Sequence, residues 1–233
     1  VGGIFVVWDE HRIDWNDVFG QHILANGDIA EGFAVDGNLL CPAEGDQVNP
    51  EISSDGNGGF ICAWIDDRNY QWDIYMQKFD ANGNLMWGDS GIFSELTGSY
   101  QQIICDSEGN SYVNVTFGYD EYRAIICQKV NADGEVLWDE PVERTDSAWY
   151  SGSKTQLISE DELIVACNTD TNEVMIKKFS SEGEEVWDQP LLFNLTDLSS
   201  FSKKLIPDGE GGIWFCWQQC HGENSEIKLQ KID

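Results

Sequence analysis

The sequence predicts an all-β fold, a β-propeller of four-stranded blades, and three observations support this prediction. The first is a repeat: one residue of a recurring strand phrase returns every 49 to 56 residues, at Gln21, Gln77, Gln128, Lys177 and Gln230. The second is that each repeat contains short runs rich in β-branched and aromatic residues, bounded by Gly, Asn and Asp. The third is the lack of any amphipathic helical pattern. A period near 50 residues is typical of propeller blades.

Each repeat is expected to contain four strands, and the second repeat shows them most clearly. The expected strands span about residues 50–54, 59–65, 73–79 and 85–87. The run Phe60–Trp64 is continuously apolar, which is expected where a sheet is buried on both faces between neighbouring sheets. The segment Asp55–Gly59 is expected to be a turn in which Asp and Asn side chains bond their own backbone.

We expect residues 1–233 to form a single propeller domain with four to five blades. The repeats lie at approximately 1–46, 47–97, 98–150, 151–199 and 200–233. The chain then starts at the second strand of one blade and stops at the third strand of another. This order fits either a five-bladed ring with two incomplete blades or an arc of a larger ring, and we favour a trimmed piece of a longer protein.

The charge limits the partners that the protein can have. The chain has 42 acidic and 13 basic residues, for a formal net charge of −29. Such a surface repels phosphate backbones and anionic lipids, so no nucleic-acid partner is expected. Membrane insertion is not expected either, because no stretch approaches the ~20 apolar residues that span a bilayer. The charge either keeps the surface soluble or serves divalent cations through carboxylate-rich loops.

The repeat phrases resemble the propeller-type repeats of large secreted bacterial proteins, with the pattern DGxGGxxxxWxDxR…DIYxQ…G…W. The second copy matches the pattern at Asp55-Gly56-Asn57-Gly58-Gly59, Trp64, Asp66, Arg68, Asp73-Ile74-Tyr75, Gln77, Gly83 and Trp87. The third and fourth copies lack the Trp and Arg of the WxDxR phrase. The resemblance implies a secreted or cell-surface protein; it implies no catalytic activity and supplies no catalytic residues.

Tryptophans and arginines recur at equivalent positions of the repeat. The tryptophans predicted to pack in the core are Trp8, Trp64, Trp217, Trp87, Trp138 and Trp187. Arg12 and Arg68 each precede an acid by five residues, Asp17 or Asp73. We expect these arginines to form structural ion pairs or backbone clamps across a loop, and contact with a ligand is the alternative.

Aromatic side chains in the expected loops are the candidate binding residues. They are Trp15, Tyr70, Trp72 and Trp149. Loops on a rigid scaffold often carry binding residues, and an aromatic face beside carboxylates suits a sugar, whose C–H groups stack on the ring. The alternative is that these aromatics are partly packed loop residues.

The same loops carry five acids that could bind calcium, namely Asp14, Asp17, Asp66, Asp67 and Asp73. Their spacing does not match an EF-hand, and no other cofactor is expected. The seven cysteines include no CxxC pair and fit no zinc pattern. Cys41 and Cys220 lie in loop-like segments, where a disulfide is conceivable.

The chain offers no recognisable catalytic motif. None of its three histidines belongs to a nucleophilic motif, and there is no P-loop or dinucleotide fingerprint. We therefore expect a non-catalytic binding or scaffold propeller that contacts a protein or a carbohydrate. One alternative is a lectin with a site in each blade. Another is a glycan-active hydrolase or lyase, which requires an acid cluster that the repeat does not display.

Overall fold

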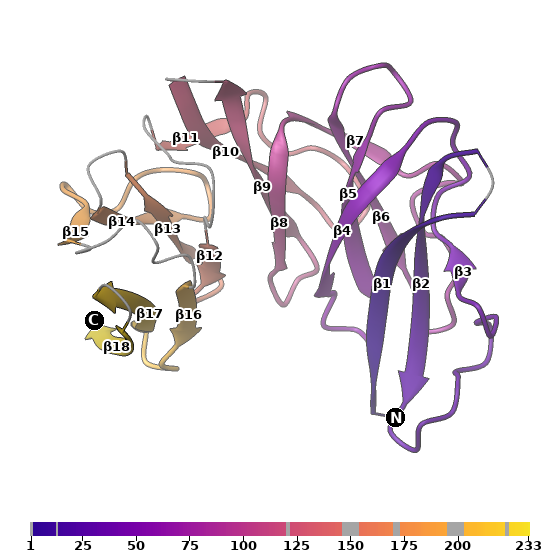
Figure 1. Ribbon diagram of the computed structural model, residues 1–233, viewed down its shortest axis with the longest axis horizontal. Coiled ribbons are helices and arrows are strands. Elements are labelled where there is room, and N and C mark those ends of the chain that lie inside the picture. Colours follow the sequence, from indigo (N-terminus) through magenta and orange to yellow (C-terminus); the bar gives the residue numbers. More distant parts are fainter. Residues whose placement is uncertain are drawn as a thin grey trace. The chain divides into compact units, whose positions relative to one another are not determined.

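The computed structural model describes residues 2–12, 14–119, 122–145, 154–169, 173–194, 203–221 and 224–233. These residues form strands and no helix, and the strands build five sheets (Figure 1). In chain order the sheets contain three, four, four, four and three strands. This confirms the predicted β-propeller of repeated blades, including the three-stranded first and last blades. The described residues contain no helix long and apolar enough to cross a membrane.

The chain divides into two compact units, residues 1–115 with 127–141 and residues 116–126 with 142–233. The first sheet consists of β1 (Gly3–His11), β2 (Asn16–Leu24) and β3 (Asn38–Leu39). The second consists of β4 (Gln47–Ser54), β5 (Phe60–Asp66), β6 (Asp73–Phe79) and β7 (Ile92–Thr97). The third consists of β8 (Ser99–Cys105), β9 (Ser111–Tyr119), β10 (Tyr122–Val130) and β11 (Val142–Thr145), and its residues are shared between the units.

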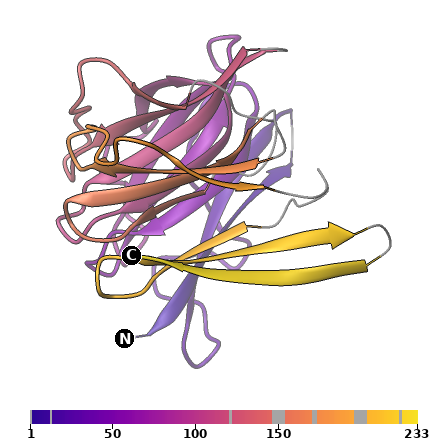
Figure 2. The same cartoon turned by 90° about the vertical axis from the view of Figure 1, so that its left-hand side faces the viewer.

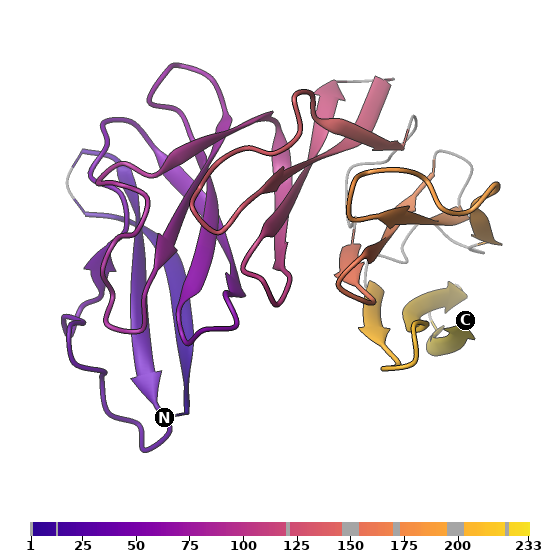
Figure 3. The same ribbon diagram turned by 180° about the vertical axis from the view of Figure 1, so that it is seen from behind.

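The second sheet confirms three of the four strands expected in that repeat (Figure 3). The fourth was wrong: Leu85 makes only an isolated bridge to Phe79, and the outer strand is β7. The reason is that Gln77 binds this segment with its side chain. Its Oε1 accepts a hydrogen bond from Trp87 N at 2.9 Å, and its Nε2 donates one to the Gly88 carbonyl at 2.6 Å. The segment is thereby held as a loop, and the chain pairs with β6 only further on.

The first two sheets share an aromatic core. Phe60, Cys62 and Trp64 on β5 are at most 1% exposed, and they pack in one cluster with Val18 and Leu40 of the first sheet. This confirms that the apolar run of β5 is buried on both faces. Among the six predicted core tryptophans, Trp64 and Trp87 are buried, whereas Trp8, Trp138, Trp187 and Trp217 are half-buried.

The Gly-rich turn has the conformation expected from its sequence. Asp55 Oδ1 accepts hydrogen bonds from the backbone N–H groups of Asn57 and Gly59, both at 2.8 Å. Gly56 and Gly58 supply the left-handed backbone, with φ angles of 74° and 91°. The same bonds recur at Asp106 and Asp208, so one side-chain device closes this turn in three blades.

The second unit contains the last two sheets. The fourth sheet consists of β12 (Lys154–Leu157), β13 (Glu162–Asn168), β14 (Glu173–Ser180) and β15 (Leu191–Asn194). The fifth consists of β16 (Lys203–Pro207), β17 (Ile213–His221) and β18 (Asn224–Ile232), with the β17–β18 hairpin drawn in yellow in Figure 2. Ile164, Ile176 and Phe215 lie in the apolar cluster of this unit.

Candidate functional site

The first strands of the second and third blades, β4 and β8, each carry a non-glycine residue with left-handed backbone. Asn49 has a φ of 54° and Tyr100 a φ of 56°. The two positions are equivalent, because each lies six residues before the turn aspartate of its repeat, Asp55 or Asp106. In β4 the distortion coincides with a register shift between Val48 and Glu51. A strained backbone of this kind is concentrated at functional sites in proteins.

These two residues border a hollow of about 400 Å³ within the first unit, which we call the first-strand pocket. It is lined by Asn49, Glu51, Ser99, Tyr100 and Gln101. Gln101 is 4% exposed, and its Nε2 donates a hydrogen bond to the Asn49 carbonyl. Its buried Oε1 accepts no hydrogen bond from the described residues. A buried acceptor without a donor is costly, so this oxygen is suited to a ligand hydroxyl.

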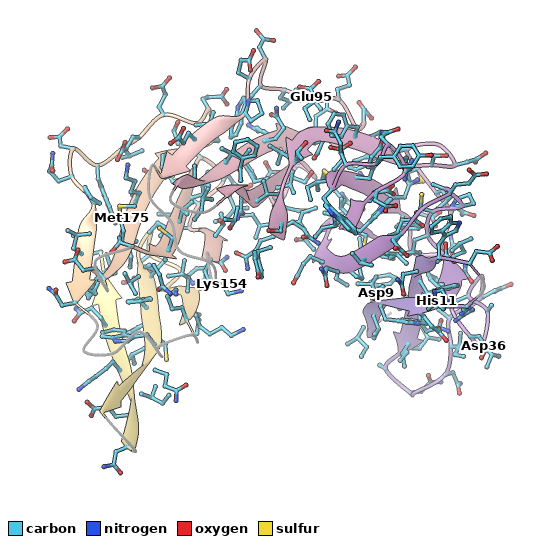
Figure 4. All side chains as sticks on the ribbon, turned by 45° about the horizontal axis from the view of Figure 1, so that its top comes forward. Asp9, His11, Asp36, Glu95, Lys154 and Met175 are labelled. Carbon is cyan, nitrogen blue, oxygen red and sulfur yellow. The ribbon has the colours of Figure 1, made fainter. Side chains whose placement is uncertain are left out.

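One carboxylate lines this pocket, and a second is hydrogen-bonded to a lining residue. Glu51 lines it and is exposed, and Asp9 on β1 accepts a hydrogen bond from Asn49 N at 3.0 Å. Figure 4 labels Asp9 with its strand neighbour His11, and Glu95 on β7. None of the five lining residues is a lysine or arginine. The pocket therefore presents one carboxylate, a phenol, a hydroxyl and amides, with the Asp9 carboxylate bonded to Asn49 behind them. Such groups bind sugar hydroxyls, and carboxylates transfer protons.

The predicted aromatic residues are on the β1–β2 and β5–β6 loops, away from the lining of this pocket. Trp15 is 47% exposed, Trp72 is 48% exposed and Tyr70 is 99% exposed. Tyr70 has a φ of 61°, and its N–H donates to the Asp67 carbonyl at 2.7 Å. Trp149 lies outside the described residues.

The predicted metal-binding acids do not gather around one point. Asp66 is fully buried beside Arg68, and Asp73 accepts a hydrogen bond from Thr97 Oγ1 at 2.8 Å. Asp67 accepts one from Asp46 N at 2.6 Å, Asp14 is exposed, and burial raises the pKa of Asp17. In the part of the chain that the structure describes, no three acids, histidines or cysteines are placed to hold a metal ion.

The repeated arginines form the predicted clamps, but with other acids. Arg68 Nη2 lies 2.6 Å from Asp66 Oδ2, and its guanidinium stacks 3.7 Å over the Tyr75 ring. In the first blade, Arg12 Nη2 lies 2.9 Å from Glu10 Oε2, and the Arg12 guanidinium stacks 3.6 Å over the Phe19 ring. Asp17 and Asp73 are not the partners: they lie on β2 and β6, and Asp73 accepts a hydrogen bond from Thr97 Oγ1 instead.

The arginines also close onto the following loop. Arg68 Nη1 donates to the Ser90 carbonyl at 3.1 Å, and Arg12 Nη2 to the Asp36 carbonyl at 2.7 Å (Figure 4 labels Asp36). A hollow of about 630 Å³ lies at the Arg12 clamp of the first blade, and Trp8, Glu10 and Gln21 are among the residues that line it. Its second-blade equivalents, Trp64, Asp66 and Gln77, are completely buried. We therefore regard this hollow as part of the blade architecture.

Cys41, for which the sequence left a disulfide open, is a buried free thiol. Its Sγ lies 3.0 Å from Arg68 Nη2. The side chain of Cys220 lies outside the described residues.

The pocket residues were missed in the sequence, although one signal pointed to them. Pro50 follows Asn49 inside a strand, and proline within a sheet marks an edge or a bulge. Tyr100 has no such neighbour, and its role follows only from its equivalence to Asn49.

Comparison with known proteins places the chain among β-propellers. No protein-family model matches the sequence, and no curated protein matches it either. Among solved structures, the polysaccharide lyase Uly1 matches with a TM-score of 0.58 at 8% identity, over 100% of this chain and 56% of that one. A GH43_1 enzyme from Xanthomonas citri matches with a TM-score of 0.49 at 10% identity, over 99% and 84%. An endo-arabinase from Bacteroides thetaiotaomicron matches with a TM-score of 0.48 at 13% identity, over 93% and 86%.

The likeness to the lyase supports the fold. The chain spans a little over half of the lyase's length. The likeness also corrects one expectation: the inference from this architecture to a non-catalytic protein was wrong, because a solved structure that resembles the chain is a polysaccharide lyase.

Proposed function

We propose that this chain belongs to a polysaccharide-cleaving enzyme whose reaction takes place at the first-strand pocket. The observation that carries the proposal is the pocket itself. It combines an exposed carboxylate, Glu51, with a strained Tyr100 and with a buried amide oxygen on Gln101 that accepts no hydrogen bond from the described residues. The likeness of the fold to a polysaccharide lyase supports the same class of substrate.

Hydrolysis fits the lining better than elimination does. Glycoside hydrolysis needs two carboxyl groups, one to protonate the leaving oxygen and one to activate water or attack the sugar. Glu51 and Asp9 are the two candidates, and Asn49 N holds Asp9 in place. Elimination from a uronate sugar would need a group that neutralises the uronate carboxylate. None of the five lining residues is a cation that could do so.

In this assignment the remaining lining residues bind and orient the sugar. Gln101 Oε1 accepts a hydroxyl hydrogen, while Ser99 and the Tyr100 phenol donate or accept further hydrogen bonds. A polysaccharide substrate is also compatible with the secreted or cell-surface location that the sequence predicts.

The test is cleavage of xylan, arabinan and polygalacturonate by the intact chain. New reducing ends without an unsaturated, ultraviolet-absorbing product indicate hydrolysis. Glu51→Gln is expected to lower the rate by about 10²- to 10⁴-fold, the usual contribution of a general acid or base. Glu95→Gln is the matched control, because Glu95 is an exposed glutamate on β7 that does not line the pocket. Full activity in Glu51→Gln would refute the assignment.

A further inference from the structure

The two loops that carry three exposed aromatic residues, Trp15, Tyr70 and Trp72, are joined by a continuous set of hydrogen bonds. Asp46, in the segment before β4, accepts hydrogen bonds on Oδ1 from Asn16 N at 2.8 Å and from Asn16 Nδ2 at 2.9 Å. Asp46 N donates to Asp67 Oδ1 at 2.6 Å, and Asp67 N donates back to the Asp46 carbonyl at 3.0 Å. Asp46 therefore ties the residue after Trp15 to the loop that carries Tyr70 and Trp72.

The β5–β6 loop is fixed at further points. Tyr70 N donates to the Asp67 carbonyl at 2.7 Å, and Gly98 N donates to the Trp72 carbonyl at 3.1 Å. Asn69 Nδ2 donates to the Tyr75 hydroxyl at 3.1 Å. The left-handed backbone of Tyr70 leaves its ring almost fully in solvent. A bulky residue in that conformation is unfavourable unless its surroundings impose it.

We propose that Trp15, Tyr70 and Trp72 form a second carbohydrate-binding platform that holds an uncharged glycan chain beyond the first-strand pocket. The choice of a glycan as ligand rests on the proposed function. Aromatic faces on pre-organised loops bind sugar rings with little loss of conformational entropy.

The charges around the platform select an uncharged glycan. Asp14, Asp17, Asp46 and Asp67 lie on or between the two loops, in a chain of net charge −29. The nearby cations, Arg12 and Arg68, are paired with Glu10 and Asp66 and stacked on rings. A glycan with uronate or sulfate groups is therefore repelled. The hydroxyls of a neutral glycan can instead donate to the carboxylates.

The test measures binding of the intact chain carrying Glu51→Gln, so that no polysaccharide is consumed. The probes are arabinoxylan, arabinan and galactomannan as neutral glycans, polygalacturonate as an acidic one, and poly-lysine as a cationic polymer. We expect saturable binding of a neutral glycan, weakened about tenfold or more by Trp15→Ala and by Trp72→Ala. Trp214→Ala is the matched control, because Trp214 is 39% exposed and lies on β17.

Three outcomes would overturn the platform: no binding of any neutral glycan by the folded chain, equal binding by Trp15→Ala, Trp72→Ala and the parent, or equal loss with Trp214→Ala. Binding of poly-lysine alone, lost with Trp72→Ala and at high salt, would replace the glycan with a cationic protein partner.

The platform and the proposed function can fail separately. A wild-type chain that cleaves no polysaccharide but binds arabinoxylan through Trp72 supports the platform and refutes the cleavage site. Cleavage that depends on Glu51, with glycan binding unaffected by either tryptophan substitution, supports the cleavage site and refutes the platform.

Discussion

Asn49 and Tyr100 have the same left-handed backbone, with φ angles of 54° and 56°, although they lie in different blades. Each is at the equivalent place in the first strand of its sheet, and the Gln101 side chain connects the two strands by donating to the Asn49 carbonyl. The strain is thus a repeated feature of neighbouring strands, and both copies border one pocket.

This backbone predicts different effects for two substitutions at Tyr100. Tyr100→Gly and Tyr100→Ala both remove the ring, but only glycine adopts a positive φ without a steric penalty. We expect Tyr100→Gly to be more stable than Tyr100→Ala by about 1 kcal/mol, measured by urea unfolding. Equal stabilities would show that the left-handed backbone at this position is not maintained in solution.

The buried tryptophan of the second blade predicts a large loss of stability. Trp64→Ala removes a completely buried side chain between the first two sheets and should cost about 3–5 kcal/mol. Its equivalent in the first blade, Trp8, is half-buried, so Trp8→Ala should cost clearly less. Denaturant unfolding of both variants tests the comparison, and an unchanged midpoint for Trp64→Ala would contradict the core assignment.

The two arginine clamps should differ in energy, because their surroundings differ. Asp66 is fully buried, so Arg68→Ala leaves a buried carboxylate without its cation and should cost about 3 kcal/mol. Glu10 and Arg12 are both exposed, so Arg12→Ala should cost less than about 1 kcal/mol. Thermal or urea unfolding of the two variants provides the measurement. Similar losses of unfolding free energy would show that the burial of Asp66 does not strengthen its pairing with Arg68.

Lys203 on β16 predicts a pH dependence of stability. It is 2% exposed and donates to Asn168 Oδ1, and burial lowers its pKa to about 8. Between pH 8 and its ordinary pKa of about 10.4, the unfolded chain binds the proton and the folded chain does not. Stability attributable to Lys203 therefore rises with pH across this window, by about 3 kcal/mol.

Lys203→Met should remove that dependence. The variant should be more stable than the parent at pH 7, and the difference should close as the pH approaches 10.4. Urea unfolding of both proteins across the window is the measurement. Taking the difference between them cancels the titration of other groups, and a constant difference would contradict the lowered pKa.

The fold could be predicted because the same sequence motifs recur in successive repeats. The Gln-Lys strand motif and the Asp-Gly turn each determine local backbone geometry, so their recurrence predicts one sheet per repeat. The outer strand of the second blade was predicted at residues 85–87 because the apolar run that ends at Trp87 is typical of a strand. Its backbone N–H is instead satisfied by the Gln77 side chain, which sequence periodicity does not reveal.

The site was harder to predict, because it depends on departures from the repeat's regular geometry. The left-handed backbone of Asn49 coincides with a register shift between β4 and β5, and the Gln101 side chain meets the Asn49 carbonyl only once two strands are adjacent. The acidic partners of Arg12 and Arg68 could have been predicted from the sequence. Glu10 and Asp66 lie near the ends of β1 and β5, only two residues before Arg12 and Arg68, whereas the acids five residues on belong to the next strand.

The cysteines make the molecule its own unfolding reporter. The thiols of Cys41 and Cys62 are free and buried, and burial raises the pKa of each, so that they are withheld from reagents in the folded state. An alkylating reagent added to the native protein would therefore label these positions only as the blades open. The order in which the two react would record which blade separates first, without any engineered probe.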